Sequence, residues 1–356
     1  MVGILKKLLF FGELPPQVLH GISISNRRIL DALSTSICVG IVEDTSSFGS
    51  FFNKMLSSVK AFILVFIKAF LKFDIFYVNA PMSRYGLLKI FFLIKVVTLI
   101  SPSTAVVAHL HRGDARLFTR DKIDYKLLHL FCDNLRYLVV LSNQSANEIV
   151  ELGLLGKDKI YVLHNTVLLE KASCYERVWS AGNLGLYCLC NYIESKRIES
   201  LVRISQNLNV KIDFNGTISS NCYMKKLYSL NVNELCFFHG TISGEEKMRT
   251  LRSAKALILP SLNEGMPLVI LESLALGTPV ICFDIGYISE YLGEDYPGLV
   301  SALNNEAMER KITWLNCLSE REYQSLRKQS FELFWKNYSP EKIDKQVLTF
   351  FHSINN

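Results

Sequence analysis

Two glutamates stand out in the stretch "PSLNEGMPLVILESLALGTPVI", residues 260–281, because almost every residue around them is apolar. Glu264 and Glu272 have seven residues between them. A carboxylate in apolar surroundings is costly unless a partner hydrogen-bonds it. Glu272 therefore lies either on a thin solvated edge of a helix or against a ligand whose polar groups complete its hydrogen bonding. The apolar neighbours favour the ligand.

The local pattern around these glutamates predicts a strand, a loop and a helix, namely "KALILP", "SLNEGM" and "PLVILESLAL". Pro267 suits the first helical turn, where its missing N–H is no loss. Gly265 allows close approach to the backbone. The amides of Met266 and Leu268 would open a helix N-terminus that can hold an anion. Glu264 would thus lie in a loop at the carboxyl end of a strand, beside an anion site.

Two other segments carry groups that could act on a ligand. Lys196 and Arg197 lie in "CNYIESKRIESL", although a lysine in such a loop is most often only solvated. His109 and His111 alternate along the strand-like "AVVAHLH", so they share one face near its carboxyl end. With Asp114 they could imitate a metal site, but further ligands are not evident. The chain has no Asp-x-Asp triplet, which argues against a metal-borne diphosphate.

The elements that must position these residues alternate regularly along the chain. Five apolar strand-like runs, each followed by a helix-length segment, precede about residue 145, and six more follow residue 180. This rhythm predicts an α/β protein with two doubly wound parallel sheets whose domains face a central cleft. Residues 159–183 lose the rhythm. We expect domains at 1–168 and 184–335, a linker at 169–183, and a last helix at 336–356 that packs back on the first domain. Ser243 and Glu246 predict a capping box for the helix "GEEKMRTLRSA".

Composition and charge indicate the class of protein and the compartment in which it is expected. The 356 residues are 49% hydrophobic and 20% charged, which is enough for two cores. Nine cysteines without a CxxC pair indicate reduced thiols, and the run "LLFFG" is too short for a signal peptide, so we expect a cytoplasmic protein. The net charge of +6 lies in residues 1–170, where 19 Lys and Arg stand against 13 Asp and Glu.

Part of that charge lies on a predicted helix at 53–72. At 100° per residue, its lysines share an arc of about 120°, with apolar residues around the rest. The helix is either a surface helix packed on a core or a device that docks on an anionic membrane. Without an aromatic platform between the basic residues, nucleic-acid binding is not supported. The lysines of this arc are Lys54, Lys60, Lys68 and Lys72.

The segment at 260–292 resembles the signature of glycosyltransferase family 4, retaining enzymes of the GT-B fold that use nucleotide sugars. Glu264 and Glu272 match the E-x7-E motif of that family. The first strand, glycine loop and helix of the family resemble "LFFGELPPQVLHGISISNRRILDAL", its acceptor-domain histidine segment resembles "HLHRGD", and the segment before its hinge resembles "VLHNTV". The resemblance runs along most of the chain.

The resemblance implies roles for individual residues. Glu264 would contact the donor sugar, and Glu272 would hold the ribose of the nucleotide. Lys196 matches the lysine that grips the diphosphate, but Asn191 stands where an arginine is usual, and Arg197 stands where glycine is common. His111 would contact the donor sugar, and the amide of Gly21 would approach the diphosphate, although a turn glycine is the plain alternative for Gly21.

The implied activity is metal-independent, retaining transfer of a sugar from a nucleotide diphosphate, with no cofactor. The resemblance is to members that build bacterial surface polysaccharides, such as O-antigen or capsule, on a polyprenyl carrier. We therefore expect a lipid-linked glycan acceptor and peripheral attachment to the anionic inner face of the plasma membrane through residues 53–72. Two alternatives stay open: a nucleotide-sugar-binding subunit without catalysis, suggested by Asn191 and by Tyr287 where a glycine is frequent, and a GT-B phosphorylase using free phosphate.

Overall fold

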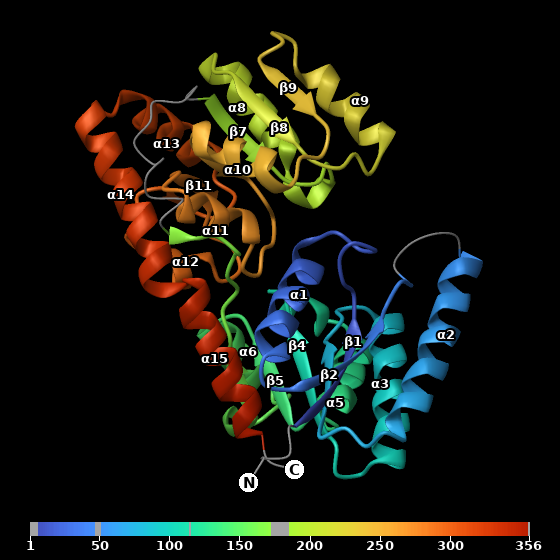
Figure 1. The fold of residues 1–356 in the computed structure, drawn as a ribbon. Helices are drawn as coiled ribbons and strands as arrows, with labels where there is room; N and C mark the ends of the chain where they lie inside the picture. The colour runs from blue at the N-terminus through green and yellow to red at the C-terminus, as the bar shows by residue number, and fades with distance from the viewer. Residues whose placement is uncertain (1–5, 47–50, 114, 172–184, 355–356) are drawn as a thin grey trace. The chain divides into compact units, whose positions relative to one another are not determined.

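The computed structural model describes residues 6–46, 51–113, 115–171 and 185–354. The chain divides into two compact units: the first contains Met1–Asn165 and Glu341–Asn356, and the second contains Thr166–Pro340. Each unit holds one six-stranded parallel sheet flanked by helices (Figure 1). The contiguous part of the first unit thus ends three residues before the expected boundary at 168. From residue 172 on, the expected linker 169–183 lies outside the described residues.

The first sheet has the strand order β2-β1-β3-β4-β5-β6, and all its pairings are parallel. Its first five strands coincide with the apolar runs of the sequence. The sixth strand was not predicted, because β6 pairs with β5 inside the segment 159–183, where the alternation of strands and helices is lost. A strand this short carries too little pattern to be recognised. The strands are β1 (Lys7–Gly12), β2 (Cys38–Glu43), β3 (Ile75–Asn79), β4 (Ala105–Leu110), β5 (Tyr137–Val140) and β6 (Ile160–Val162).

Helices cover both faces of the first sheet. Successive strand residues point to opposite faces, so Leu9 and Phe11 enter one core while Leu8 and Phe10 enter the other. The first core is closed by α2 (Phe51–Ala69), α3 (Arg84–Ile100), α4 (Ala115–Phe118), α5 (Lys122–Cys132) and α6 (Asn143–Glu151). The second is closed by α1 (Gly21–Ser34) and α15 (Pro340–Ser353).

Helix α15, drawn in red in Figure 1, belongs to the first unit although it ends the chain. Ile343, Val347 and Phe350 are buried in the core that it shares with α1. The ring of Phe351 packs edge-on against Tyr77 of β3, with 5.2 Å between their centroids. The last helix therefore completes a sheet face that would otherwise be exposed.

The second sheet has the order β12-β11-β10-β7-β8-β9, again with parallel pairing throughout. All six strands coincide with predicted runs. The strands are β7 (Gly185–Leu189), β8 (Ile212–Asn215), β9 (Cys236–His239), β10 (Ala254–Leu259), β11 (Val280–Phe283) and β12 (Leu299–Val300). The helices are α8 (Ile198–Leu208), α9 (Asn221–Leu230), α10 (Gly244–Ser253), α11 (Leu268–Ala275), α12 (Ile288–Leu292), α13 (Asn305–Cys317) and α14 (Glu320–Asn337).

One helix start differs from its prediction. Ser243 is the N-cap of α10, as expected, but its side chain makes no capping hydrogen bond, so the predicted capping box with Glu246 is wrong. A reciprocal box does open α14, where Ser319 and Glu322 each bond the backbone of the other. Both pairs fit the same sequence pattern, which therefore does not determine the side-chain rotamers.

Helix α2 is turned differently from the expectation for residues 53–72. The row Ala61, Val65 and Ala69 faces the core, and Lys68 on the same side donates to the carbonyl oxygen of Ile41 at 2.9 Å. The outward side is apolar, with Ile63 51% exposed. The lysine arc is therefore not the outermost face of the helix. No helix in the described ranges combines the length and apolar character that a membrane crossing requires.

Candidate functional site

The loop between β10 and α11 carries Glu264 at the carboxyl edge of the second sheet. Its side chain is 9% exposed, and its Oε1 lies 2.5 Å from Nζ of Lys196. Lys196 ends a short 3-10 turn after β7, the strand next to β10. The amide of Leu262 donates to the carbonyl of Ser195 at 2.8 Å and ties the two loops together. The structure thus brings together two residues that were both predicted for the site.

A glycine and a tyrosine hold this loop in shape. Gly286 has φ +57°, and a Cβ there would lie 2.2 Å from the carbonyl oxygen of Glu264, so both the backbone conformation and the close approach require glycine. The hydroxyl of Tyr291 donates to the carbonyl of Gly265 at 3.0 Å. These supporting residues were not identified from the sequence, because their role depends on contacts between separate loops.

Glu272 lies on α11 and is 6% exposed. Its Oε1 is 2.5 Å from Nζ of Lys247 on α10, the helix that packs beside α11. Burial raises the pKa of Glu272 and is the larger effect, while the nearby lysine charge opposes the shift. The carboxylate in the apolar helix is therefore neither on a solvated edge nor unpaired. Lys247 was missed, although the order α10–β10–α11 places the two helices as neighbours.

The second carboxylate oxygen of Glu272, Oε2, differs from Oε1 in its hydrogen bonding. Oε2 is buried and has no hydrogen-bond partner in the described part of the chain. A buried acceptor without a donor costs free energy of about 1–3 kcal/mol. Because Lys247 already occupies Oε1, the open oxygen can accept a hydrogen bond from a ligand hydroxyl without displacing the ion pair.

The start of α11 lies between the two glutamates. Pro267 is the N-cap, with φ −68° and ψ 128°, so it precedes the first turn in which it was expected, and the helix begins at Leu268. The side chains of Met266 and Leu268 are buried and anchor this end of the helix. The first amides of a helix have no intrahelical acceptors and carry its positive end. The segment can therefore place backbone donors beside Glu264.

The three residues considered for binding the diphosphate, Lys196, Arg197 and Asn191, differ in their surroundings. Arg197 is in the left-handed region, with φ 49° and ψ 38°, a conformation that favours glycine. Its Nη2 donates to Oδ1 of Asn305 at 3.1 Å, and its guanidinium lies over the ring of Phe283. Asn191 is exposed. Of these three residues, only Lys196 bonds to Glu264.

In the first unit, the histidines lie at the end of β4. Their rings are in contact, with 3.9 Å between the centroids and a tilt of 32°, and the hydroxyl of Tyr77 lies 2.7 Å from Nδ1 of His109. Burial lowers the pKa of His111 to about 3, with a smaller contribution from the charge of His20. Nε2 of each ring is buried without a partner among the described residues. Asp114, the third member of the possible metal set, lies outside the described residues.

Gly21 is the first residue of α1 and is exposed. A Cβ there would meet no atom within 4 Å, so the side-chain position of Gly21 is open. His20 caps the helix through a reciprocal box with Ser23, and its Nε2 lies 2.7 Å from the carboxylate of Glu13. The position is compatible with an approaching anion, and it does not require glycine for backbone conformation.

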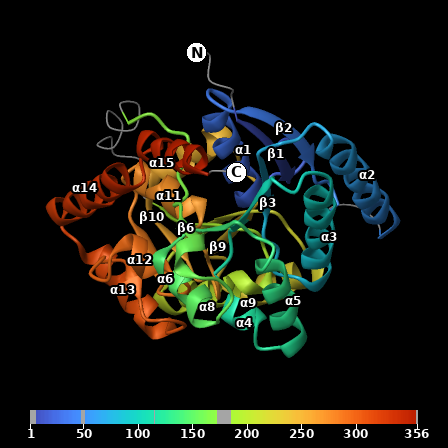
Figure 2. The same ribbon diagram turned by 90° about the horizontal axis from the view of Figure 1, so that it is seen from below.

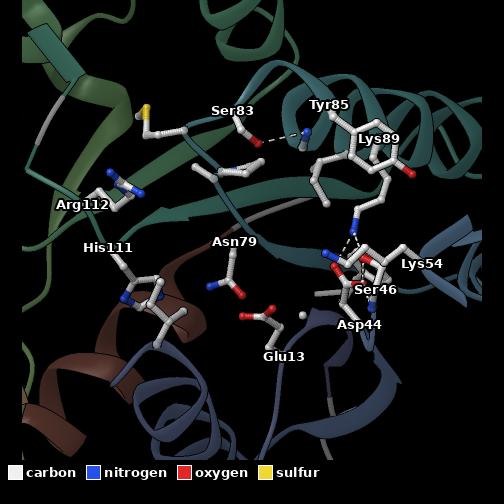
Figure 3. Close-up of a pocket in the computed structure, with 18 residues that line it drawn as sticks. Glu13, Asp44, Ser46, Lys54, Asn79, Ser83, Tyr85, Lys89, His111 and Arg112 are labelled. Atoms are coloured by element: carbon white, nitrogen blue, oxygen red, sulfur yellow. Dashed lines mark hydrogen bonds and ion pairs between the residues drawn. The ribbon is translucent and has the colours of Figure 1, made fainter. Parts of the chain in front are cut away.

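A pocket of about 420 Å³ in the first unit was not anticipated from the sequence. The loops at the carboxyl ends of β1, β2, β3 and β4 line it together with α2 and α3. Figure 3 shows Lys89 bonded to Asp44 and Ser46 at one end, with His111 and Arg112 toward the other. The pocket thus combines charged groups, His111 and an apolar wall, a combination suited to a polar substrate. Its loops are far apart in the sequence, so only the sheet topology brings them together.

Comparisons with known proteins agree with this geometry. Residues 195–331 match the family model Glycosyl transferases group 1, and this range contains Lys196, Glu264 and Glu272. A putative teichuronic acid biosynthesis glycosyltransferase, TuaC, of Bacillus subtilis is 36% identical over 74 residues, which cover 21% of this chain and 19% of that protein. An uncharacterized glycosyltransferase of Methanocaldococcus jannaschii is 28% identical over 163 residues, covering 42% of this chain and 41% of that one. The matches therefore span less than half of these two relatives.

Solved structures resemble the whole chain. Sucrose-phosphate synthase from Thermosynechococcus elongatus superposes with a TM-score of 0.78 at 15% identity and covers 98% of both chains. HepE of Anabaena, solved with UDP and glucose, gives a TM-score of 0.72 at 14% identity and covers 98% of this chain and 100% of its own. These likenesses and the two parallel sheets confirm the predicted two-domain α/β fold of the GT-B class.

Proposed function

We propose that this protein is a glycosyltransferase that moves a sugar from a nucleotide diphosphate donor to a glycan acceptor. The observation that carries the proposal is the pair of buried glutamates in the group 1 segment. Glu264 lies beside Lys196 and the start of α11, and Glu272 keeps one buried oxygen without a donor. The HepE structures with UDP and with UDP-glucose support a nucleotide sugar as the donor.

Each part of the donor matches one part of the second unit. A ribose has hydroxyls that can donate to Oε2 of Glu272, and the transferred sugar has hydroxyls that can donate to Glu264. The diphosphate is an anion suited to the amides at the start of α11 and to the ammonium of Lys196. Lys196 has three N–H donors, so its bond to Glu264 leaves donors for a phosphate. Arg197 adds positive charge to the same loop.

The chemistry follows from where charge develops. The bond between the anomeric carbon and the diphosphate oxygen breaks, and its electron pair leaves with the diphosphate. Lys196 and the helix amides stabilise that leaving anion. An acceptor hydroxyl attacks the same face of the sugar, its proton passes to the leaving phosphate, and configuration is retained. We assign this path because the described site offers no evident covalent nucleophile. In the first unit, Nε2 of neutral His111 is buried without a partner among the described residues, so it can bond a hydroxyl of a substrate in the pocket of that unit.

For the acceptor we propose a lipid-linked glycan bound in the pocket of the first unit, as in surface polysaccharide assembly. The TuaC relative, a putative glycosyltransferase of teichuronic acid biosynthesis, supports this class of product. The pocket supports it by joining polar groups at the sheet edge to the apolar helices α2 and α3.

We also propose that transfer needs no metal ion, so treatment with EDTA leaves activity intact. Loss of activity that a divalent ion restores would contradict this.

A donor screen tests the proposal and identifies the base. Thermal unfolding is measured with UDP-, GDP- and dTDP-sugars, because a ligand that binds only the folded state raises the midpoint. We expect one nucleotide class to stabilise the protein and Glu272→Ala to remove most of that effect. The exposed Glu246→Gln on α10 is the control and should respond like the wild type. No stabilisation by any nucleotide sugar would contradict the proposal.

A further inference from the structure

Helix α2 exposes large apolar side chains along its outward side. Phe52, Leu56 and Ile67 are 65%, 58% and 57% exposed, and Val59, Ile63 and Phe66 continue the same side. At 100° per residue these six positions lie within an arc of about 100°. We call them the α2 apolar face. Contiguous exposed apolar surface of this kind marks an interaction site.

The inward side of α2 explains why these residues remain outside. Ala61 and Ala69 are small and let the helix lie close to the sheet, with Val65 between them. Lys68 uses its ammonium to satisfy the carbonyl of Ile41, and so occupies part of the inner side. The core therefore accepts small and polar residues from α2, and its large apolar residues have no place inside the first unit. The arrangement is the reverse of an ordinary surface helix.

The neighbouring helix extends the surface. Figures 1 and 2 show α2 and α3 side by side at the outside of the first unit, and their residues are in contact. Tyr85 and Phe92 of α3 are 63% and 57% exposed. The hydroxyl oxygens of Ser58 on α2 and Tyr85 on α3 lie 3.2 Å apart, and this hydrogen bond links the two helices. Because Tyr85 and Lys54 also line the 420 Å³ pocket, the apolar surface is continuous with its rim.

Charge around the α2 apolar face decides between possible occupants. Neither α2 nor α3 contains an aspartate or glutamate, whereas Lys60 and Lys95 are exposed on them. A second copy placed on the same face would bring like charges together without a carboxylate to pair them. An anionic bilayer accepts both features, because acyl chains cover apolar side chains and head groups attract lysines.

We propose that the first unit docks on an anionic membrane by inserting the α2 apolar face into the head-group layer, with lysines at its edge. The helix lies in the plane of the interface and opens the adjoining pocket toward the lipid surface. Part of this inference rests on the proposed function, because a lipid-linked acceptor would then reach the pocket while its chain stays in the bilayer. The predicted docking through a basic face is thereby replaced by docking through an apolar one.

The test is co-sedimentation with vesicles of phosphatidylglycerol and phosphatidylcholine, using the full chain without a nucleotide sugar. The test variant is Leu56→Gln/Ile63→Gln/Ile67→Gln, and glutamine keeps the helix propensity of α2. The matched control, Leu117→Gln/Ile123→Gln/Leu130→Gln, changes equally exposed apolar residues of α4 and α5 in the same unit. We expect the test variant to lose at least about tenfold in vesicle affinity and the control to bind like the wild type.

Salt separates insertion from purely electrostatic attachment. At about 1 M salt the screening length falls to about 3 Å, so attachment through lysines alone would be lost. We expect much of the wild-type binding to survive and the Lys60→Gln/Lys95→Gln variant to bind vesicles at high salt as the wild type does. Complete release by salt, or equal binding by the α2 test variant and the wild type, would overturn the proposal.

Two further readouts keep the outcomes distinct. Gel filtration shows whether the face joins two copies: a wild-type dimer that the α2 variant converts to a monomer, without vesicle binding, would overturn the proposal. Transfer to a soluble acceptor is measured without vesicles and should be unchanged in the α2 variant. Vesicle binding by a protein that has no transfer activity would leave the docking intact and contradict only the proposed function.

Discussion

At the residue scale, the site depends on how two carboxylates are satisfied. Both glutamates pair with a lysine at 2.5 Å, but the second oxygen of Glu272 remains buried without a donor. The two glutamates were identified from the sequence because charged residues in an apolar segment are conspicuous, whereas Lys196 was assigned through the family resemblance. The sequence did not identify Lys247 or Gly286, whose roles appear only when separate loops are packed together. The residue types were thus predictable, whereas their pairing was not.

Glu272→Ala tests the role of the open oxygen. Removing the carboxylate leaves the ribose hydroxyls of a bound nucleotide without an acceptor, so we expect binding to weaken by about 1–3 kcal/mol. Calorimetric titration with the free nucleoside diphosphate measures the change. The exposed Glu246→Gln serves as the control on the neighbouring helix. An affinity equal to that of the wild type would show that the nucleotide does not use Glu272.

At the element scale, strand β4 delivers two histidines to one face, as its alternation predicted. What the alternation could not show is that both rings would be buried and in contact with each other. For helix α2, the sequence pattern did not predict which side of the helix faces the core. Its periodicity separates a lysine arc from an apolar arc, but periodicity alone does not say which arc faces the core. Ala61 and Ala69 decide that question, because small residues allow close packing against the sheet.

The burial of His111 predicts a pH dependence of stability. Its pKa in the folded protein is lowered to about 3 from 6.5, so between these values the unfolded chain binds a proton that the folded chain does not. The free energy of unfolding from this group should therefore fall as the pH drops below 6.5, by about 1.4 kcal/mol per pH unit. Denaturant titrations across this range should show a shallower dependence for His111→Gln. Parallel curves for the two proteins would contradict the assignment.

At the scale of the whole molecule, the alternation of strands and helices was sufficient to predict two parallel sheets, because most strands are rich in apolar residues. The last strand of the first sheet and the last helix of the chain were less predictable. Strand β6 was too short to be recognised, and residues 343–354 contribute to a core whose other members lie 180 residues or more earlier in the chain. Such long-range contacts leave no local pattern.

Phe351→Ala tests the contribution of α15 to the first unit. The side chain is fully buried against Tyr77, so its removal should cost about 3–5 kcal/mol of stability. Hydrogen exchange should show faster exchange in β1, β3 and α1 of the first unit, while β10 and β11 of the second unit keep their protection. The exposed Phe237→Ala is a suitable control, because it removes the same ring from a solvated position of the second unit. Equal protection in wild type and variant would contradict the assignment of α15 to this core.

The most direct test of the central claim is sugar transfer from a labelled donor by the wild type and by Glu264→Gln, with the exposed Glu245→Gln as control. The donor is the nucleotide sugar that stabilises the protein in the thermal screen. We predict product formation by the wild type and the control, and a loss of about a hundredfold or more in Glu264→Gln with its thermal midpoint preserved. Transfer by Glu264→Gln at the wild-type rate, or no transfer by the wild type from a donor that it binds, would contradict the account.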